Sequence, residues 1–344
     1  MPPTNKSILD HNADGALPQQ ATLILQDGHK LTYTSTGDQN LPLLLFIIGS
    51  SGLGSLYSRL ADELSKTFRC IYYDKRGFLP AKTDTTVVER ETNIFIPASQ
   101  NADDAAALIT HVSPHTPAYV FGTSTGATAV LDLTLRYPQL IHTAVLHEPI
   151  TFSVMPPSTL KEEILTLYRK LAFFAVPAEG SKAFADYMFQ PSAHTSPERP
   201  PVGPSSEKAS SNREALLKNE PEPQARPTTA ASPAPSPAQV FNARQGLQEG
   251  NAMLAYEVDA ARARSLRDKL VLVRGEESRL WPISQPVLSL GRALGGKEVW
   301  ELAGDHLSFA AKRNVARFAG QLVEVLRREG RVPVPVEGAG KARL

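Results

Sequence analysis

Short apolar runs alternate with helical patterns along much of the 344-residue chain, and this alternation limits the folds that it can form. Residues 43–48 are apolar without interruption, which is typical of a strand buried on both faces of a sheet. Further strands are predicted at 70–74, 118–121, 142–146, 269–273 and 298–302, and helices at 56–64, 99–111, 127–137, 285–294 and 309–326. Strands that alternate with helices in this way predict an α/β fold with a doubly wound parallel sheet.

The two ends of the chain have a different character. Residues 21–25 and 30–34 are strand-like and flank Asp27-Gly28, which indicates a β-hairpin. Residues 1–18 are polar and residues 330–344 are punctuated by Gly and Pro, so we predict two flexible tails.

The alternation is interrupted in the middle of the chain. A helix is predicted at 158–172, and helical periodicity returns at 241–258. Between them, residues 190–237 contain 11 of the 28 prolines and are rich in Ser, Ala and charge. Such a segment cannot bury enough apolar surface to offset its chain entropy, so we predict that it is disordered.

These patterns divide the chain into a core and an insertion. The predicted core comprises residues 19–152 and 266–329, and residues 153–265 form an inserted helical lid. The insertion follows a strand of the predicted parallel sheet. Because ligands bind at the carboxyl ends of parallel strands, a lid placed there is positioned to cover a site.

Composition excludes several classes of function. The formal net charge is +1, which argues against strong attraction to nucleic acid or to anionic membranes. The chain has one cysteine, Cys70, and no apolar run long enough for a signal peptide or a membrane span. We therefore expect a cytoplasmic protein whose partner is a small-molecule substrate, and we make no prediction of its oligomeric state.

A candidate nucleophile lies between a predicted strand and a predicted helix. Gly122-Thr123-Ser124-Thr125-Gly126 matches the pattern G-x-S-x-G, directly after the apolar run 118–121. In this setting a serine stands on a strained turn and its hydroxyl projects from the top of the sheet, while the flanking glycines leave room for close packing. The N–H of Thr125, at the start of the helix, is placed to stabilise an oxyanion.

The segments 41–77, 118–149 and 270–326 resemble the α/β-hydrolase family. This resemblance implies an eight-stranded, mostly parallel sheet with helices on both faces and a lid over the site. Gly304-Asp305-His306 follows the last predicted strand and resembles the family's G-x-H segment, so His306 is the expected general base. His147 is the main competing histidine.

The acid of the triad has two candidates. The family commonly has Asp three residues after the glycine that here is Gly275, but this chain has Ser278 there. Glu277 is one alternative in this loop. Glu148, at the end of the strand that follows the nucleophile helix, is the preferred one, because some members of the family, including esterase- and lactonase-type members, carry the acid at that position.

The resemblance also implies the rest of the site. Gly49-Ser50-Ser51-Gly52 occupies the position of the family's His-Gly-x segment, so the backbone N–H of Ser50 is the expected second oxyanion donor beside Thr125. Apolar residues suited to a substrate pocket lie in the lid: Leu165, Tyr168, Leu171, Phe173, Phe174, Phe184, Tyr187, Met188, Phe189, Met253, Leu254 and Tyr256.

The sequence thus predicts a serine hydrolase that cleaves a carboxylic ester or lactone of a small, moderately apolar molecule through an acyl-enzyme, without a metal or cofactor. Thioesterases and C–C bond hydrolases use the same residue types, so these activities stay open. A ligand-binding or receptor-like protein on a hydrolase scaffold, with little turnover, is an alternative of another class.

Overall fold

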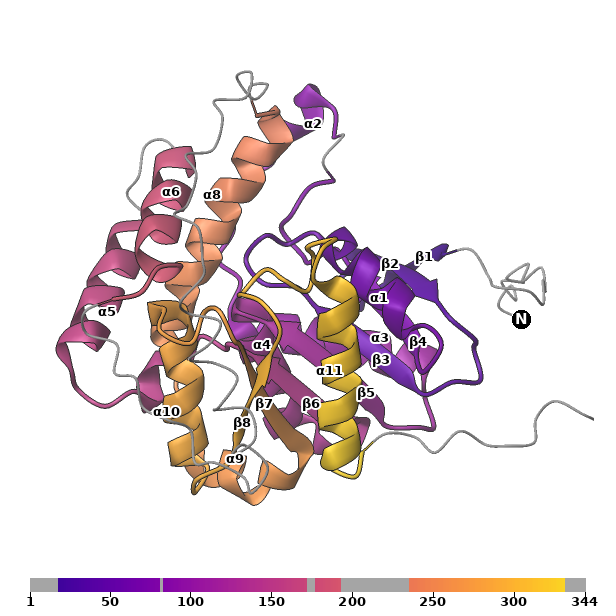
Figure 1. Ribbon diagram of the computed structural model, residues 1–344. Helices are drawn as coiled ribbons and strands as arrows, with labels where there is room; N and C mark the ends of the chain where they lie inside the picture. Colours follow the sequence, from indigo (N-terminus) through magenta and orange to yellow (C-terminus); the bar gives the residue numbers. More distant parts are fainter. Residues whose placement is uncertain (1–17, 81–82, 172–176, 193–234, 332–344) are drawn as a thin grey trace, which may run out of the picture.

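The computed structural model describes residues 18–80, 83–171, 177–192 and 235–331 (Figure 1). Most of the segment predicted to be disordered, 193–234, lies outside the described residues. So do residues 1–17 and 332–344 of the two predicted tails.

A single sheet of eight strands runs through the molecule, in the order β1-β2-β4-β3-β5-β6-β7-β8. The strands are β1 Gln19–Ile24, β2 Lys30–Thr36, β3 Leu43–Ile47, β4 Arg69–Tyr73, β5 Ala118–Thr123, β6 Ile141–His147, β7 Leu270–Gly275 and β8 Val299–Leu302. Strand β2 is antiparallel to both of its neighbours, and all other pairs are parallel. The predicted fold class, a mostly parallel eight-stranded sheet, is confirmed.

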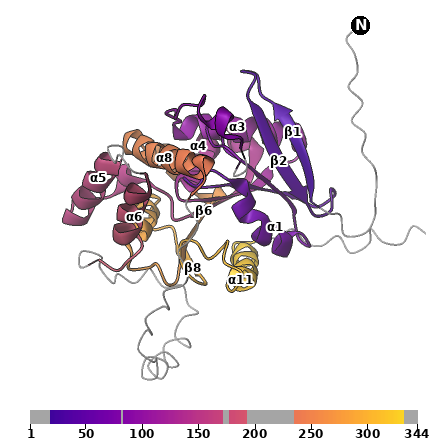
Figure 2. The same cartoon turned by 90° about the horizontal axis from the view of Figure 1, so that it is seen from above.

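Helices cover both faces of the sheet. They are α1 Ser58–Leu64, α3 Ala98–Val112, α4 Thr125–Arg136, α9 Ala260–Ser265, α10 Gln285–Ala293 and α11 Val315–Arg328, with the short α2 Thr85–Val88 at the periphery. Viewed from above, α3 and α4 lie on one face, and α1 and α11 lie on the other (Figure 2). Single turns of 3-10 helix link the elements: η1 Gly54–Tyr57, η2 Pro138–Leu140, η3 Phe152–Val154, η4 Met253–Ala255, η5 Arg267–Lys269 and η6 Pro282–Ser284.

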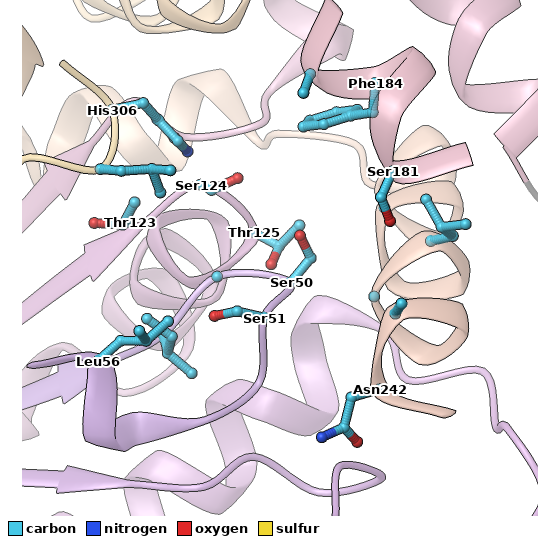
Figure 3. Close-up of a pocket in the computed structure, with 18 of the residues that line it drawn as sticks. Ser50, Ser51, Leu56, Thr123, Ser124, Thr125, Ser181, Phe184, Asn242 and His306 are labelled. Atoms are coloured by element: carbon cyan, nitrogen blue, oxygen red, sulfur yellow. The ribbon is translucent and has the colours of Figure 1, made fainter. Parts of the chain in front are cut away.

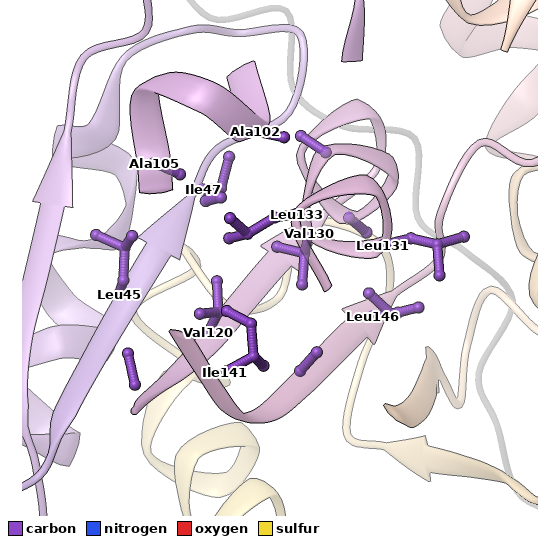
Figure 4. Packing of buried hydrophobic residues seen from close by; sticks show 14 of the residues in the cluster. Leu45, Ile47, Ala102, Ala105, Val120, Val130, Leu131, Leu133, Ile141 and Leu146 are labelled. Atoms are coloured by element: carbon purple, nitrogen blue, oxygen red, sulfur yellow. The ribbon is translucent and has the colours of Figure 1, made fainter. Parts of the chain in front are cut away.

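The central strand β3 shows why its residues are apolar on both faces. Successive side chains of a strand point to opposite faces. Leu45 and Ile47 accordingly pack beneath α3 and α4, where Figure 4 shows them with Val120 and Val130. Phe46 lies in the second core, beneath α1 and α11.

Three helices of the predicted lid pack together, and in the sequence they lie between strands β6 and β7. They are α5 Thr159–Leu171, α6 Pro177–Met188 and α8 Pro237–Ala252 (Figures 1 and 2). Their apolar faces form a separate buried cluster, to which α5 contributes Tyr168 and α8 contributes Leu247. Ile150 and Phe152 of the core pack into the same cluster.

The structure departs from the predicted boundaries in four places. Helix α8 begins at Pro237, inside the segment predicted to be disordered, because Ser236 and Gln239 form a reciprocal capping box. Helix α9 lies within the range predicted for the lid, yet its Ala263 packs in the core on the face of the sheet that α3 and α4 cover. The last helix begins at Val315 rather than 309, since residues 309–314 form turns. The predicted tail from 330 is still attached at Arg331, whose carbonyl oxygen accepts a hydrogen bond of 2.5 Å from Tyr119.

Within these described ranges, no helix is both long and apolar enough to span a membrane.

Candidate active site

Ser124 lies on the turn between β5 and α4 in a backbone conformation that few residues adopt. Its φ is 58° and its ψ is −126°. A residue with a side chain pays about 1–3 kcal/mol for such a conformation, and strain of this kind is concentrated at functional sites. This is the strand–turn–helix setting that a G-x-S-x-G nucleophile requires.

The glycines of the motif are needed because the chain approaches itself closely here. A Cβ atom on Gly126 would lie 2.2 Å from the carbonyl oxygen of Ile47. One on Gly122 would lie 2.6 Å from the carbonyl oxygen of Gly126. Both distances are too short for a real contact, so larger residues would force α4 away from β3 and β5.

Glu148 directly follows β6 and points toward His306. The N–H of Ser124 donates to the carbonyl of His147 over 3.0 Å, so β5 and β6 stay paired at the nucleophile turn. Glu148 also has a positive φ, 48°. Its Oε2 lies 2.6 Å from Nδ1 of His306, and both side chains are buried. The structure therefore joins the preferred acid to the expected base.

The charge of Glu148 determines which ring nitrogen of His306 donates to it. Burial is the largest single influence and opposes the negative charge, but the hydrogen bond and charge of His306, with smaller contributions from His147 and Ser278, together lower the pKa of Glu148 to about 2. A carboxylate can only accept, so Nδ1 of His306 is the donor in this hydrogen bond. The opposite ring nitrogen, Nε2, is then left to accept a proton, as a general base must.

The loop after β7 contacts the carboxylate of Glu148, the preferred acid. Glu277, the alternative acid, is exposed and lies outside the arrangement around His306. Ser278 is fully buried and its hydroxyl donates a hydrogen bond to Oε1 of Glu148. The N–H of Gly275 donates to the same oxygen over 2.9 Å. Ser278 was noted in the sequence as a departure from the family pattern, but its role as a partner of Glu148 was missed.

A tight turn holds His306 in place. Gly304 has a φ of 84°, and a Cβ atom there would lie 2.0 Å from Oγ of Ser308. The carboxylate of Asp305 accepts from the N–H of Leu307 at 3.0 Å and from the Ser308 hydroxyl at 2.8 Å. The glycine of the G-x-H segment is thus required by backbone conformation and by space.

His147, the competing histidine, lies behind the site rather than in it. It is fully buried, its ring stacks on that of His306 with centroids 5.7 Å apart, and Thr123 Oγ1 lies 3.0 Å from its Nδ1. Burial lowers the pKa of His147 to about 4, so it is neutral near pH 7. It therefore packs against the base without adding a second charge.

The two expected oxyanion residues lie next to each other beside the nucleophile. Figure 3 shows Ser50 and Thr125 adjacent, with Ser124 and His306 at the same end of the cavity. A Cβ atom on Gly49 would lie 3.1 Å from Cβ of Ser124, so the loop after β3 runs directly against the nucleophile turn. The assignment of the backbone N–H groups of Ser50 and Thr125 as oxyanion donors stays a prediction.

A cavity of about 440 Å³ opens over Ser124 and is roofed by the lid. Four of the apolar lid residues expected there line it: Tyr168, Leu171, Phe184 and Phe189. The ring of Phe189 lies over His306, with centroids 5.2 Å apart. Leu165, Tyr187, Met188, Met253, Leu254 and Tyr256 pack in the lid's own cluster instead, and Phe173 and Phe174 lie outside the described residues.

The lining of this cavity carries no fixed charge in the part of the chain that the structure describes. Ser50, Ser181, Gln239 and Asn242 are polar but neutral, and the titratable side chains among the described lining residues are His306 and Tyr168. Burial raises the pKa of Tyr168, so its hydroxyl is uncharged near pH 7. No group of three or more His, Cys, Asp or Glu side chains in the described ranges is placed to hold a metal ion.

Solved structures with the same architecture span nearly the whole chain. An α/β hydrolase enzyme, MGS-M2, from a deep-sea metagenome library is 14% identical, with a TM-score of 0.57 over 92% of this chain and 100% of that one. The chain has the α/β-hydrolase fold. The fold is shared with a thermophilic esterase from Thermogutta terrifontis, at 16% identity and a TM-score of 0.57 over 91% of this chain and 99% of the esterase. An enol-lactonase from Burkholderia xenovorans is also 16% identical, with a TM-score of 0.55 over 89% and 100%.

Sequence similarity is more limited than similarity of the α/β-hydrolase fold. The uncharacterized hydrolase YraK of Bacillus subtilis is 29% identical over 121 residues, which are 35% of this chain and 42% of that protein. The match thus spans less than half the length of this relative. No protein-family model matches the chain.

Proposed function

We propose that the protein is a serine hydrolase that cleaves an uncharged carboxylic ester or lactone of a small, apolar molecule through an acyl-enzyme. One observation carries the proposal. A serine with a φ of 58° shares a cavity with a histidine whose Nδ1 is bound, over 2.6 Å, by a buried carboxylate. Strained serine, oriented imidazole and buried acid are the parts that nucleophilic catalysis on an acyl group needs.

The reaction begins with attack of Ser124 Oγ on the ester carbonyl carbon. Nε2 of His306 accepts the hydroxyl proton, and Glu148 stabilises the imidazolium without itself being protonated. The N–H groups of Ser50 and Thr125 hold the oxyanion of the tetrahedral intermediate. The imidazolium then protonates the leaving alkoxide, and the acyl group stays on Ser124.

Water completes the cycle by the same route. His306 takes a proton from a water molecule as its oxygen attacks the acyl carbon, and it returns the proton to Ser124 when the acid leaves. In a lactone the alcohol and the acid belong to one molecule, so the product is a single hydroxy acid. Neither step requires a metal ion or an organic cofactor.

The substrate class follows from the cavity. A charged group entering a cavity without a counter-charge would lose its hydration with nothing in return. The apolar lining favours burial of hydrocarbon, and the few neutral polar groups suit a carbonyl or hydroxyl. By their names, two proteins that share the fold are an esterase and an enol-lactonase, which supports esters and lactones as the first compounds to test.

A turnover assay with a panel of neutral aryl esters and lactones tests the proposal. Wild-type protein is expected to hydrolyse at least one member, and the variant Ser124→Ala is expected to lose that activity while it unfolds with an unchanged or higher midpoint. Ester hydrolysis that persists undiminished in Ser124→Ala would overturn the assignment of the nucleophile.

A further inference from the structure

A buried ion pair ties the lid helix α8 to the core. Lys75 follows β4, and its Nζ contacts Oε1 of Glu249 on α8. Each side chain is only 1% exposed. The same Oε1 accepts a hydrogen bond of 3.0 Å from the amide of Asn101 on α3. The carboxylate thus joins α8 to two separate elements of the core.

This pair is a costly way to attach a lid. Burial lowers the pKa of Lys75 and raises that of Glu249, because the charged form of each group loses its hydration in the interior. Replacing a buried ion pair by apolar residues of similar size is often neutral or stabilising. Stability alone therefore gives no reason for a lysine and a glutamate at these two positions.

The position of Glu249 offers a reason. The hydroxyl of Thr125 lies beside the carboxylate. Thr125 Oγ1 and Glu249 Oε2 are both buried, and neither completes a hydrogen bond of regular geometry within the described residues. The contact is therefore a close polar approach to the first residue of α4, the residue whose N–H is the expected oxyanion donor.

The same face of α8 touches the second oxyanion residue. Gly246 lies three residues before Glu249, on the same side of the helix. A Cβ atom on Gly246 would lie 2.3 Å from the carbonyl oxygen of Ser50, so the backbone of α8 packs directly against the loop after β3. Figure 3 shows α8 beside the cavity that Ser50 and Thr125 line.

We propose that Glu249, anchored by Lys75, is a positioning residue that sets the geometry of the oxyanion hole from the lid. Through Glu249 and Gly246, helix α8 braces the two donor segments, at Thr125 and at Ser50. Helix α8 and the oxyanion hole are then held together by these contacts. The two donors are therefore in position before a substrate binds beneath α8. This inference rests on the proposed serine hydrolase function.

The variant Glu249→Gln tests the proposal, because it keeps the size of the side chain and removes its charge. We expect kcat for a neutral aryl ester to fall about 10- to 100-fold, the cost of misplacing a catalytic group by up to about 1 Å, with KM changed far less. The rate of phosphonylation of Ser124 by a fluorophosphonate is expected to fall in parallel, since the phosphoryl oxygen gains negative charge as Ser124 attacks and fluoride leaves, and this oxygen uses the same donors. Glu249→Gln with wild-type kcat and labelling rate would overturn the proposal, whatever its stability.

A matched control separates positioning from stability. Glu329 forms a partly buried pair with Lys297, at 3.0 Å, and accepts a hydrogen bond from Trp300, away from the cavity. Glu329→Gln is expected to lower the unfolding midpoint while leaving kcat and the labelling rate of folded protein unchanged. If it lowers kcat as much as Glu249→Gln does, the effect is one of general destabilisation and the proposal fails.

Further variants keep the proposal testable if Glu249→Gln does not fold. The double variant Lys75→Met, Glu249→Met leaves no unpaired charge and is expected to fold, yet to show the same loss of kcat; full activity would overturn the proposal. Thr125→Val, which keeps the backbone N–H, is expected to reduce kcat, and to add little when combined with Glu249→Gln. Wild-type protein that shows neither turnover nor labelling would instead refute the proposed function.

Discussion

Ser278 donates a hydrogen bond to the carboxylate of Glu148, which lies 130 residues earlier in the chain. Ser278 stands three residues after Gly275, at the position where the α/β-hydrolase family commonly has its acid. The carboxylate of Glu148 lies at the end of β6, and the loop after β7 contacts it through the Ser278 hydroxyl and through the N–H of Gly275. The acid is thus held by two neighbouring strand ends. Burial opposes the charge of Glu148, yet its pKa is about 2, mainly because of the hydrogen bond from His306, with a smaller contribution from the Ser278 hydroxyl.

The variant Ser278→Ala is expected to destabilise the protein by about 2 kcal/mol at pH 7, the usual worth of a buried hydrogen bond to a charged group. Glu148 has an ordinary pKa of 4.5 and a folded-state pKa of about 2. Its stabilising contribution is therefore complete above pH 4.5 and is lost as the pH falls toward 2. The loss of the hydroxyl raises the folded-state pKa, so the difference between variant and wild type shrinks across this interval. Urea unfolding at pH 7, 4.5 and 3 measures it, and a difference independent of pH would contradict the assignment.

Glu148→Gln is expected to lower kcat about 10³- to 10⁴-fold, because an amide in place of the carboxylate favours the wrong tautomer of the catalytic histidine. Glu277→Gln serves as the control, since Glu277 is exposed and does not contact His306. Its kcat should equal that of the wild type. Steady-state kinetics with one neutral aryl ester compare the three proteins, and an equal loss in both variants would exclude the structural assignment of the acid.

Ser124→Gly is expected to raise the free energy of unfolding by about 1 kcal/mol while abolishing turnover. Glycine adopts a φ of 58° without the strain that serine suffers there. Gly126→Ala should lower the free energy of unfolding, because its new methyl group would lie 2.2 Å from the Ile47 carbonyl oxygen. Thermal unfolding of both variants checks the pair, and a Ser124→Gly variant less stable than the wild type would count against a strained turn.

The described lining of the cavity, which carries no fixed charge, predicts discrimination against anionic substrates. p-Nitrophenyl butyrate and the mono-p-nitrophenyl ester of succinate have the same leaving group and similar length, and differ by a terminal carboxylate. We expect kcat/KM to be about 100-fold lower for the succinate ester, because its charge would be buried without a partner. Equal values for the two esters would refute an uncharged substrate class.

Local patterns were sufficient to predict the sheet and to place Ser124 and His306 at the turns where the structure brings them to one cavity. Each of these depends on a short segment, such as 118–126 or 299–306, in which strand, turn and functional residue follow one another. The preference for Glu148 needed one more step, the adjacency of two strand ends. Its positive φ and its contact with Ser278 could not be read from the sequence, because they arise when β6 and β7 pair.

The missed features depend on contacts between distant segments. Helix α6 was not predicted, because Gly180 and Ser181 interrupt its helix-forming residues and its apolar face is explained only by packing on α5 and α8. The last helix starts late, because Asp305, Ser308 and Asn314 hold the preceding residues in turns. Lys75 and Glu249 lie 174 residues apart, and no periodicity in the sequence connects them.

Treatment of the purified protein with a fluorophosphonate probe, followed by mass spectrometry of the labelled peptide, tests the central claim most directly. The probe reacts with serines that a neighbouring base has activated. We predict stoichiometric labelling of Ser124, abolished in Ser124→Ala and strongly slowed in Glu148→Gln. A folded protein that takes up no label, or takes it up at another residue, would contradict the assignment of Ser124 as the nucleophile of an active hydrolase.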